Sequence, residues 1–132
     1  MDEGAWKILK RAAINARAHA YAPYSGFTVG AAIQTKSGAV FIGCNVENAS
    51  YGATICAERA ALAATVAAGE RELIALAIVS GATSPTPPCG ICRQSLAELA
   101  PDLPIRSYTG GAHAEFDIGS LFPDAFGRDQ LD

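Results

Sequence analysis

The sequence lacks the features of three large classes of protein. It has no basic surplus, with 10 Lys and Arg against 13 Asp and Glu and a net charge of −3 at pH 7, whereas a groove that follows nucleic-acid phosphates needs clustered positive charge. Its longest notable apolar run, residues 73–79, is far shorter than the ~20 residues that cross a bilayer. Residues 1–4 offer neither the basic flank nor the apolar core of a signal peptide. We therefore expect a cytoplasmic protein that binds neither nucleic acid nor membrane.

Charged residues are also scarce, at 17%, while 50% of the residues are apolar. A disordered chain has the opposite balance. A length of 132 residues is enough for one domain with a sizeable core. We therefore expect a single folded domain over residues 1–132.

Hydrophobic periodicity, together with Gly and Pro breaks, divides the chain into helices and strands. Helices are predicted at residues 3–20, 56–68 and 90–100. Strands are predicted at residues 27–35, 40–43, 73–80 and 104–108, with a weaker strand at 115–118. The first two strands flank a Ser37-Gly38 turn and are expected to form a hairpin. This order of elements predicts an α/β protein with helices packed on the faces of a sheet.

Three of the four cysteines lie where a loop becomes a helix. Cys56 begins one predicted helix, while Cys89 and Cys92 begin another in a Cys-x-x-Cys spacing. Helix N-termini favour thiolates, and this spacing lets two sulfurs approach one ion. Three protein ligands leave a fourth position for water, as in catalytic zinc sites. The fourth cysteine, Cys44, is expected to be a small buried hydrophobe.

Glu58 stands two residues after the first of these cysteines. A carboxylate beside a zinc site can take a proton from water and return it to a leaving group. Alone, Glu58 would read as an exposed carboxylate in a first helical turn, and Cys89 with Cys92 could be a dithiol redox pair. The redox alternative leaves the Cys56-Ala57-Glu58 sequence unexplained. His19 and His113 are expected to be surface or packing residues rather than ligands.

The combined pattern resembles the cytidine deaminase family over nearly the whole chain. Some zinc deaminases hold their metal with three cysteines in such a pattern, and others with one histidine and two cysteines. The segments that carry the resemblance are residues 21–25, 27–32, 43–51, 56–61, 88–94 and 121–126, which include Gly-Cys-Asn-Val-Glu-Asn-Ala-Ser-Tyr, Cys-Ala-Glu-Arg-Ala-Ala and Pro-Cys-Gly-Ile-Cys-Arg-Gln. The resemblance implies a three-layer α/β/α fold with a mixed, roughly five-stranded sheet. It also implies hydrolytic deamination of cytidine and deoxycytidine to uridine and deoxyuridine, with release of ammonia, as in pyrimidine salvage.

The resemblance also implies a role for each matching residue. Cys56, Cys89 and Cys92 would hold one zinc ion per chain. Glu58 would protonate N3 of the base, help to activate the attacking water and deliver a proton to the departing amine.

Substrate contacts follow from the same resemblance. Asn45 and Glu47 would bind the ribose hydroxyls, and Phe27 would pack on the pyrimidine ring. The backbone near Ala57 and Cys89 would read the edge of the base. As alternatives, Asn45 and Glu47 could be ordinary loop residues, and Phe27 a core aromatic.

The short, all-thiolate form resembles the homotetrameric group of nucleoside deaminases. In that group Tyr51 and Phe126 would reach a neighbouring subunit's site. A deaminase of a nucleoside antibiotic such as blasticidin S shares the zinc motifs but lacks the Asn-Val-Glu-Asn-Ala form seen at residues 45–49. A zinc-stabilised binding module would explain neither the open fourth position nor Glu58.

Charge predicts a further role for Arg59. Three thiolates and Zn²⁺ leave a net charge of −1, which weakens the metal as a Lewis acid. Arg59 follows Glu58 and is always protonated, so its guanidinium can donate to the sulfurs and withdraw charge. The alternative is a surface arginine in a helix-face ion pair.

Overall fold

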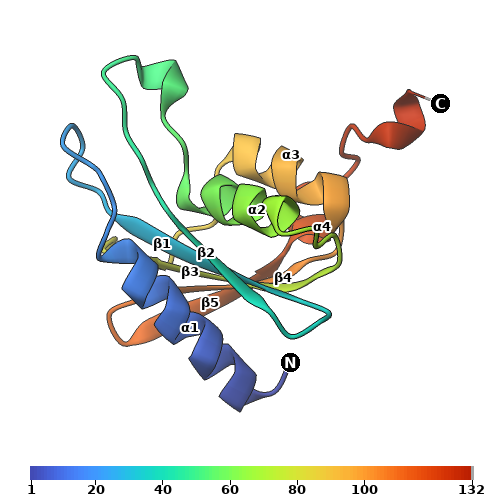
Figure 1. The fold of residues 1–132 in the computed structure, drawn as a ribbon, viewed down its shortest axis with the longest axis horizontal. Coiled ribbons are helices and arrows are strands. Elements are labelled where there is room, and N and C mark those ends of the chain that lie inside the picture. Colours follow the sequence, from blue (N-terminus) through green and yellow to red (C-terminus); the bar gives the residue numbers. More distant parts are fainter. Residues whose placement is uncertain (132) are drawn as a thin grey trace.

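The computed structural model describes residues 1–131 and contains a mixed, twisted sheet (Figure 1). Its strands are β1 (Val29–Thr35), β2 (Val40–Cys44), β3 (Leu73–Ser80), β4 (Pro104–Thr109) and β5 (Ala112–Asp117). They lie in the order β2-β1-β3-β4-β5, with β3 and β4 parallel and the other pairs antiparallel. This confirms the predicted mixed five-stranded sheet.

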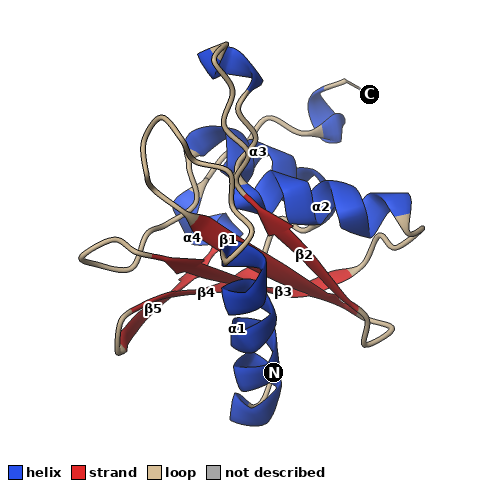
Figure 2. Ribbon diagram, turned by 60° about the vertical axis from the view of Figure 1, so that its left-hand side comes forward, coloured by secondary structure: helices blue, strands red, loops and turns tan. Residues whose placement is uncertain are grey.

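Helices cover both faces of the sheet (Figure 2). One face carries α1 (Glu3–Arg17), and the other carries α2 (Ala57–Ala67), α3 (Gly90–Leu99) and the short α4 (Ile118–Leu121). Two 3₁₀ turns, Tyr51–Ala53 and Arg128–Gln130, lie outside these layers. The three-layer α/β/α arrangement is therefore confirmed. No helix within residues 1–131 is long and apolar enough to span a membrane.

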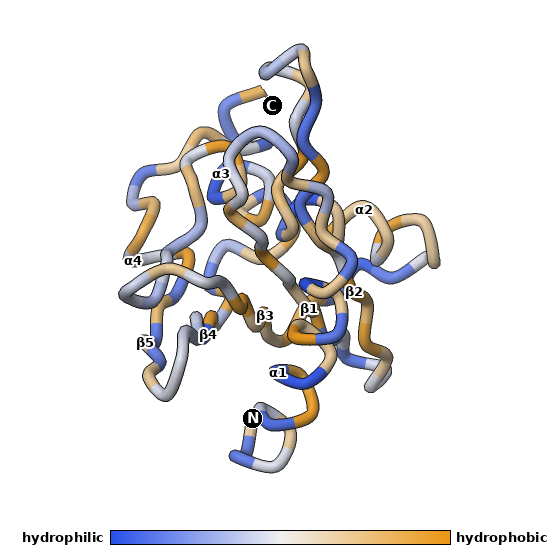
Figure 3. The backbone as a smooth tube through the Cα atoms, turned by 90° about the vertical axis from the view of Figure 1, so that its left-hand side faces the viewer, coloured by the Kyte–Doolittle hydropathy of each residue, from blue (hydrophilic) through white to orange (hydrophobic). Residues whose placement is uncertain are grey.

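A capping residue fixes the start of the first helix, and a stripe of apolar residues fixes which side of it packs on the sheet. Asp2 accepts a hydrogen bond from the Ala5 amide at 2.8 Å and so satisfies a free N–H group of the first turn. Trp6, Leu9 and Ala13 are buried on one side, and the tube of α1 in Figure 3 changes repeatedly between hydrophobic and hydrophilic colours. The helix ends at Arg17 instead of reaching residue 20. The His19 and Ala20 amides donate to carbonyls only three residues back, and the Tyr21 amide donates to the Asn45 carbonyl instead of to the helix.

The apolar run in β3 is explained by burial on both faces. Leu76 and Ile78 belong to the core beneath α2 and α3, whereas Ala75, Ala77 and Val79 belong to the core beneath α1. A strand covered on both faces needs no polar alternation.

The sheet topology also places two loops together. Both β2 and β3 run antiparallel to β1, so their C-terminal ends lie beside the N-terminal end of β1, at the same end of the sheet. The chain leaves that end from β2 towards α2, and from β3 towards α3. The N-termini of α2 and α3, which carry the cysteine motifs, are therefore neighbours.

Two strands start at other residues than predicted: β1 starts at Val29 instead of residue 27, and β5 starts earlier than expected. The last strand begins at Ala112 rather than at residue 115 and pairs with β4 along its whole length. Gly110, at φ +53°, allows the tight turn that brings it back. Its first residues are exposed at the edge of the sheet, so their small and polar side chains give no apolar pattern.

Candidate active site

The three cysteines of the predicted metal site meet at the N-termini of α2 and α3. Cys56 and Cys89 precede the first residues of the two helices, and Cys92 lies in the first turn of α3. Their sulfur atoms all lie within 4.8 Å of one another, and the Sγ atoms of Cys56 and Cys89 are 3.7 Å apart. Neither capping cysteine uses its side chain to cap its helix. The sulfurs therefore remain available to a ligand.

Charge within the cluster favours a cation. The pKa of the Cys56 thiol falls to about 5, because it accepts a hydrogen bond from Cys92 and a further one from Arg59. The pKa of the Cys92 thiol is raised, because it donates to the Cys56 sulfur and is buried. One of these thiols loses its proton readily, and its negative charge then opposes deprotonation of a second thiol. Three cysteine sulfurs this close together form a donor set that fits a zinc ion well.

Glu58 is buried beside this cluster, in the first turn of α2, with only 6% of its surface exposed. Burial, with a smaller contribution from the Cys56 thiolate, raises the pKa of its carboxyl to about 7. Both protonation states are therefore accessible near neutral pH, as proton transfer requires. The burial excludes the alternative of an exposed first-turn carboxylate.

Glu58, Cys56 and Cys89 line one cavity of about 170 Å³. Its other lining residues are Phe27, Val29, Asn45, Thr54, Ala57, Ile78, Thr86 and Pro87. Most of these side chains are apolar, so a flat ring would meet apolar walls with polar groups at one end. The cavity thus brings two of the three predicted metal ligands and the predicted proton carrier against one small space.

Asn45 and Phe27 shape the wall of this cavity. The Asn45 side chain accepts from the Val29 amide at 2.8 Å and donates to the Phe27 carbonyl at 2.7 Å. The asparagine therefore joins the end of β2 to the segment that precedes β1. Phe27 is 40% exposed, which excludes the alternative of a core aromatic.

Arg59 lies against the sulfurs as its charge predicts. Its Nη2 atom is 3.6 Å from the Cys56 sulfur and donates to the Thr54 carbonyl at 3.2 Å. Contact with both the Cys56 and Cys92 sulfurs raises the pKa of the guanidinium above its already high value. Within residues 1–131 it forms no ion pair with a carboxylate, so the surface-pair alternative is wrong.

Three predicted substrate residues do not line the cavity in this single chain. Glu47 accepts hydrogen bonds from the amides of Tyr24 and Ser25, at 2.9 and 3.1 Å, and from the Ser25 hydroxyl. These bonds lower the pKa of its carboxyl. It faces a separate depression beside Tyr51, which is 77% exposed. Phe126 is 57% exposed, and the segments that carry these two aromatic residues project from the body of the molecule (Figure 1).

Two further residues shape the site, although the sequence analysis did not single them out. Gly43 in β2 allows close contact with α2, since a Cβ there would lie 2.4 Å from the Ala61 nitrogen and 2.5 Å from the Ala57 carbonyl oxygen. Arg93 donates to the Pro88 carbonyl at 2.8 Å and to the Leu121 carbonyl at 3.0 Å. Both residues lie inside the quoted motifs, which was the only available clue. Cys44 is half-buried and lies outside the cluster.

Comparisons with known proteins agree with this geometry. The family model for the cytidine and deoxycytidylate deaminase zinc-binding region matches residues 6–103. The cytidine deaminase of Halalkalibacterium halodurans is 45% identical over 95% of this chain and 96% of its own length. The crystal structure of cytidine deaminase from Burkholderia pseudomallei is 49% identical, with a TM-score of 0.88 over 96% of this chain and 100% of that one. The cytidine deaminase structure from Mycobacterium tuberculosis is 46% identical, with a TM-score of 0.81 over 92% of this chain and 97% of that one. With a matched family model, close relatives over almost its full length and the same fold, the chain belongs to the cytidine and deoxycytidylate deaminase family.

Proposed function

We propose that this chain, as one domain over residues 1–132, hydrolyses cytidine and deoxycytidine to uridine and deoxyuridine with release of ammonia. One observation carries the proposal: a buried carboxyl, that of Glu58, faces the same cavity as the Cys56 and Cys89 sulfurs. The substrate is inferred from relatives that are named cytidine deaminase and match this chain over nearly its full length. The expected setting is pyrimidine salvage in the cytoplasm.

Zinc is the metal that the donor set fits. Cys56, Cys89 and Cys92 would hold one ion per chain, since three sulfurs within 4.8 Å of one another come from two helix ends. When bound, zinc supplies a Lewis acid that makes water a stronger nucleophile at neutral pH.

The residues of the chain supply proton transfer and orientation. Glu58 takes a proton from the attacking water and gives it to N3 of the base; it then takes the proton of the new hydroxyl at C4 and gives it to the departing amine, which leaves as ammonia. Burial of the carboxyl keeps this exchange away from bulk water. Phe27 packs on the pyrimidine ring, and the backbone at Ala57 and Cys89 reads the base edge. Asn45 binds a ribose hydroxyl from the cavity wall.

Of the remaining predicted contacts, those of Tyr51 and Phe126 require a second copy of the chain. Glu47 completes the ribose site, and Tyr51 and Phe126 of one subunit reach the cavity of another in a homotetramer. The exposure of both aromatic side chains supports this arrangement, because exposed aromatics on projecting segments are typical of interfaces. The antibiotic deaminase is not favoured, since the relatives are named for cytidine.

The test is incubation of the purified protein with cytidine, deoxycytidine and blasticidin S in parallel. Loss of the cytosine absorbance reports turnover, and elemental analysis of the same sample reports zinc. We expect turnover of both nucleosides and about one zinc per chain. Active protein free of zinc would remove the metal from the proposal, and turnover of blasticidin S alone would replace the substrate.

A further inference from the structure

A second cavity, of about 600 Å³, lies on the opposite face of the sheet from the cysteine cluster. It is lined by Lys10, Ile14, Arg17, Ala18, Thr28, Val79, Ser80, Tyr108, Thr109 and Gly110, and shares none of these with the first cavity. Neighbouring residues of β3 separate the two, because Val79 packs towards α1 and Ile78 towards α2 and α3. Its volume falls in the range of small-molecule sites.

The charges of this cavity are all of one sign. Lys10 and Arg17, two turns apart on α1, are its only charged lining residues. Within residues 1–131 neither forms an ion pair with a carboxylate. Glu3 and Glu115 are both held by Arg106 instead. In a chain with a net charge of −3, this is a local positive site that attracts anions.

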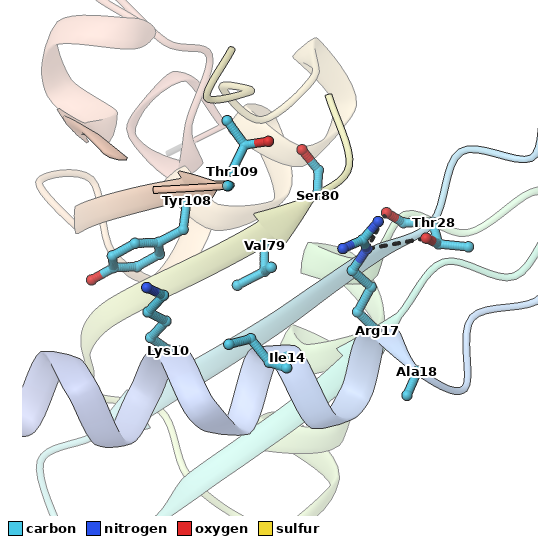
Figure 4. A pocket seen from close by; sticks show the side chains of 10 residues that line it. Lys10, Ile14, Arg17, Ala18, Thr28, Val79, Ser80, Tyr108 and Thr109 are labelled. Atoms are coloured by element: carbon cyan, nitrogen blue, oxygen red, sulfur yellow. Dashed lines mark hydrogen bonds between the residues drawn. The ribbon is translucent and has the colours of Figure 1, made fainter. Parts of the chain in front are cut away.

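One end of the cavity has the donors that a phosphate group requires. The Nε atom of Arg17 donates to the Thr28 carbonyl at 3.1 Å and to the Thr28 hydroxyl oxygen at 3.0 Å (Figure 4). These bonds fix the guanidinium and leave its two terminal amino groups without a hydrogen-bond partner among the described residues. The Thr28 hydroxyl accepts from Arg17, so its own proton remains free to donate. Ser80 adds another hydroxyl at this end. Its oxygen accepts from the Ala82 amide and lies 3.3 Å from the Thr86 hydroxyl, so its proton can be donated to a ligand when Thr86 is the donor of that pair.

Gly81 contributes by having no side chain. A Cβ at Gly81 would lie 2.5 Å from the Nη2 atom of Arg17, so a side chain at this position would displace the guanidinium from where it now lies. The fork of an arginine held in this way is suited to two hydrogen bonds with a phosphate.

The other end of the cavity offers a separate cation. The Nζ atom of Lys10 lies 4.9 Å from the centre of the Tyr108 ring, on the same cavity wall (Figure 4). Residues seven apart on a helix are separated by about 10 Å along its axis. The Lys10 side chain is directed to Tyr108 and the Arg17 side chain to Thr28, so in this arrangement the two cations face separate ends of the cavity. Ile14 and Val79 form an apolar stretch between them.

We propose that this cavity binds a small phosphorylated molecule that also carries a carboxylate. The phosphate lies against Arg17, Thr28 and Ser80. The carboxylate lies against Lys10, and the organic part between them contacts Ile14 and Val79. The site is independent of the deamination chemistry on the other face of the sheet.

Two related probes test the proposal by calorimetric titration of the full-length protein without nucleoside. 4-Carboxyphenyl phosphate carries both acidic groups, and phenyl phosphate carries the phosphate alone. We expect saturable binding of the first at about one site per chain, and about tenfold weaker binding of the second, since a charge-assisted contact is lost. Equal affinity for the two probes, or no saturation by either, would overturn the proposal.

Variants assign the two ends. Lys10→Gln should weaken binding of 4-carboxyphenyl phosphate about tenfold and leave phenyl phosphate unaffected, whereas Arg17→Gln should weaken both. Lys7→Gln, an exposed change one turn away on α1 and outside the cavity, is the matched control and should alter neither. If Arg17→Gln fails to fold, the Lys10→Gln comparison decides alone. An equal effect of Lys10→Gln on both probes would contradict the assignment.

Discussion

Replacement of Gly43 by alanine tests how the sheet positions α2, the helix that carries Glu58. The new Cβ would lie 2.4 Å from the Ala61 nitrogen and 2.5 Å from the Ala57 carbonyl oxygen. Both are backbone atoms of α2, so no side-chain rotation can relieve the contact. Ordinary contacts of a Cβ lie at 3.4–4 Å, so α2 must move away from β2 by roughly 1 Å.

Such a movement affects both stability and chemistry. Overpacking of this kind costs about 1–3 kcal/mol, and we expect the upper part of that range because backbone atoms are involved. Glu58 follows Ala57 directly, so the carboxyl moves with the helix. A displacement of ~1 Å in a catalytic group can lower the rate about 100-fold. Urea unfolding and the rate of cytidine turnover at fixed zinc content measure the two effects.

Gly111→Ala is the matched control, because a Cβ at Gly111 meets no heavy atom within 4 Å and its φ is not positive. It should leave both stability and turnover within a small factor of the wild type. Wild-type stability and rate in Gly43→Ala would show that α2 does not depend on its close contact with β2, and the reasoning would fail.

Two further predictions concern charge and assembly. Arg59→Gln should retain zinc but slow turnover by about 10–100-fold. An additional Cys56→His change, which removes one negative charge, should recover part of the rate. Wild-type turnover in the Arg59→Gln single variant would refute the charge argument. Phe126→Ala should lower activity in a protein that light scattering shows to be a tetramer, whereas Leu131→Ala, which also removes an exposed apolar side chain, should not; a fully active monomer at assay concentration would contradict the shared site.

The helices and inner strands could be predicted because their sequence patterns are local. The stripe of Trp6, Leu9 and Ala13 repeats with helical period, and the apolar run of β3 can only be buried on both faces. The start of β5 could not be predicted, because its pairing with β4 is made by the backbone and leaves small, exposed side chains.

The residues that meet at the candidate site could be picked out for a similar reason. Cys56 and Glu58 lie in one short segment, and Cys89 with Cys92 in another, so each motif contains its own spacing. The close approach at Gly43 depends on a contact between segments that the sequence does not show. The proposed approach of Tyr51 and Phe126 to a cavity involves neighbouring chains, so it cannot be read from the fold of one chain.

The most direct test of the central claim is the turnover of Glu58→Gln at measured zinc content. Glutamine has nearly the same shape but cannot carry the proton, so we expect the fold and zinc to be retained while the rate falls by about 10⁴-fold or more. Glu98→Gln, an exposed change on α3, should keep the wild-type rate. A Glu58→Gln protein that retains more than about a tenth of the wild-type rate would contradict the assignment of Glu58 as the proton carrier.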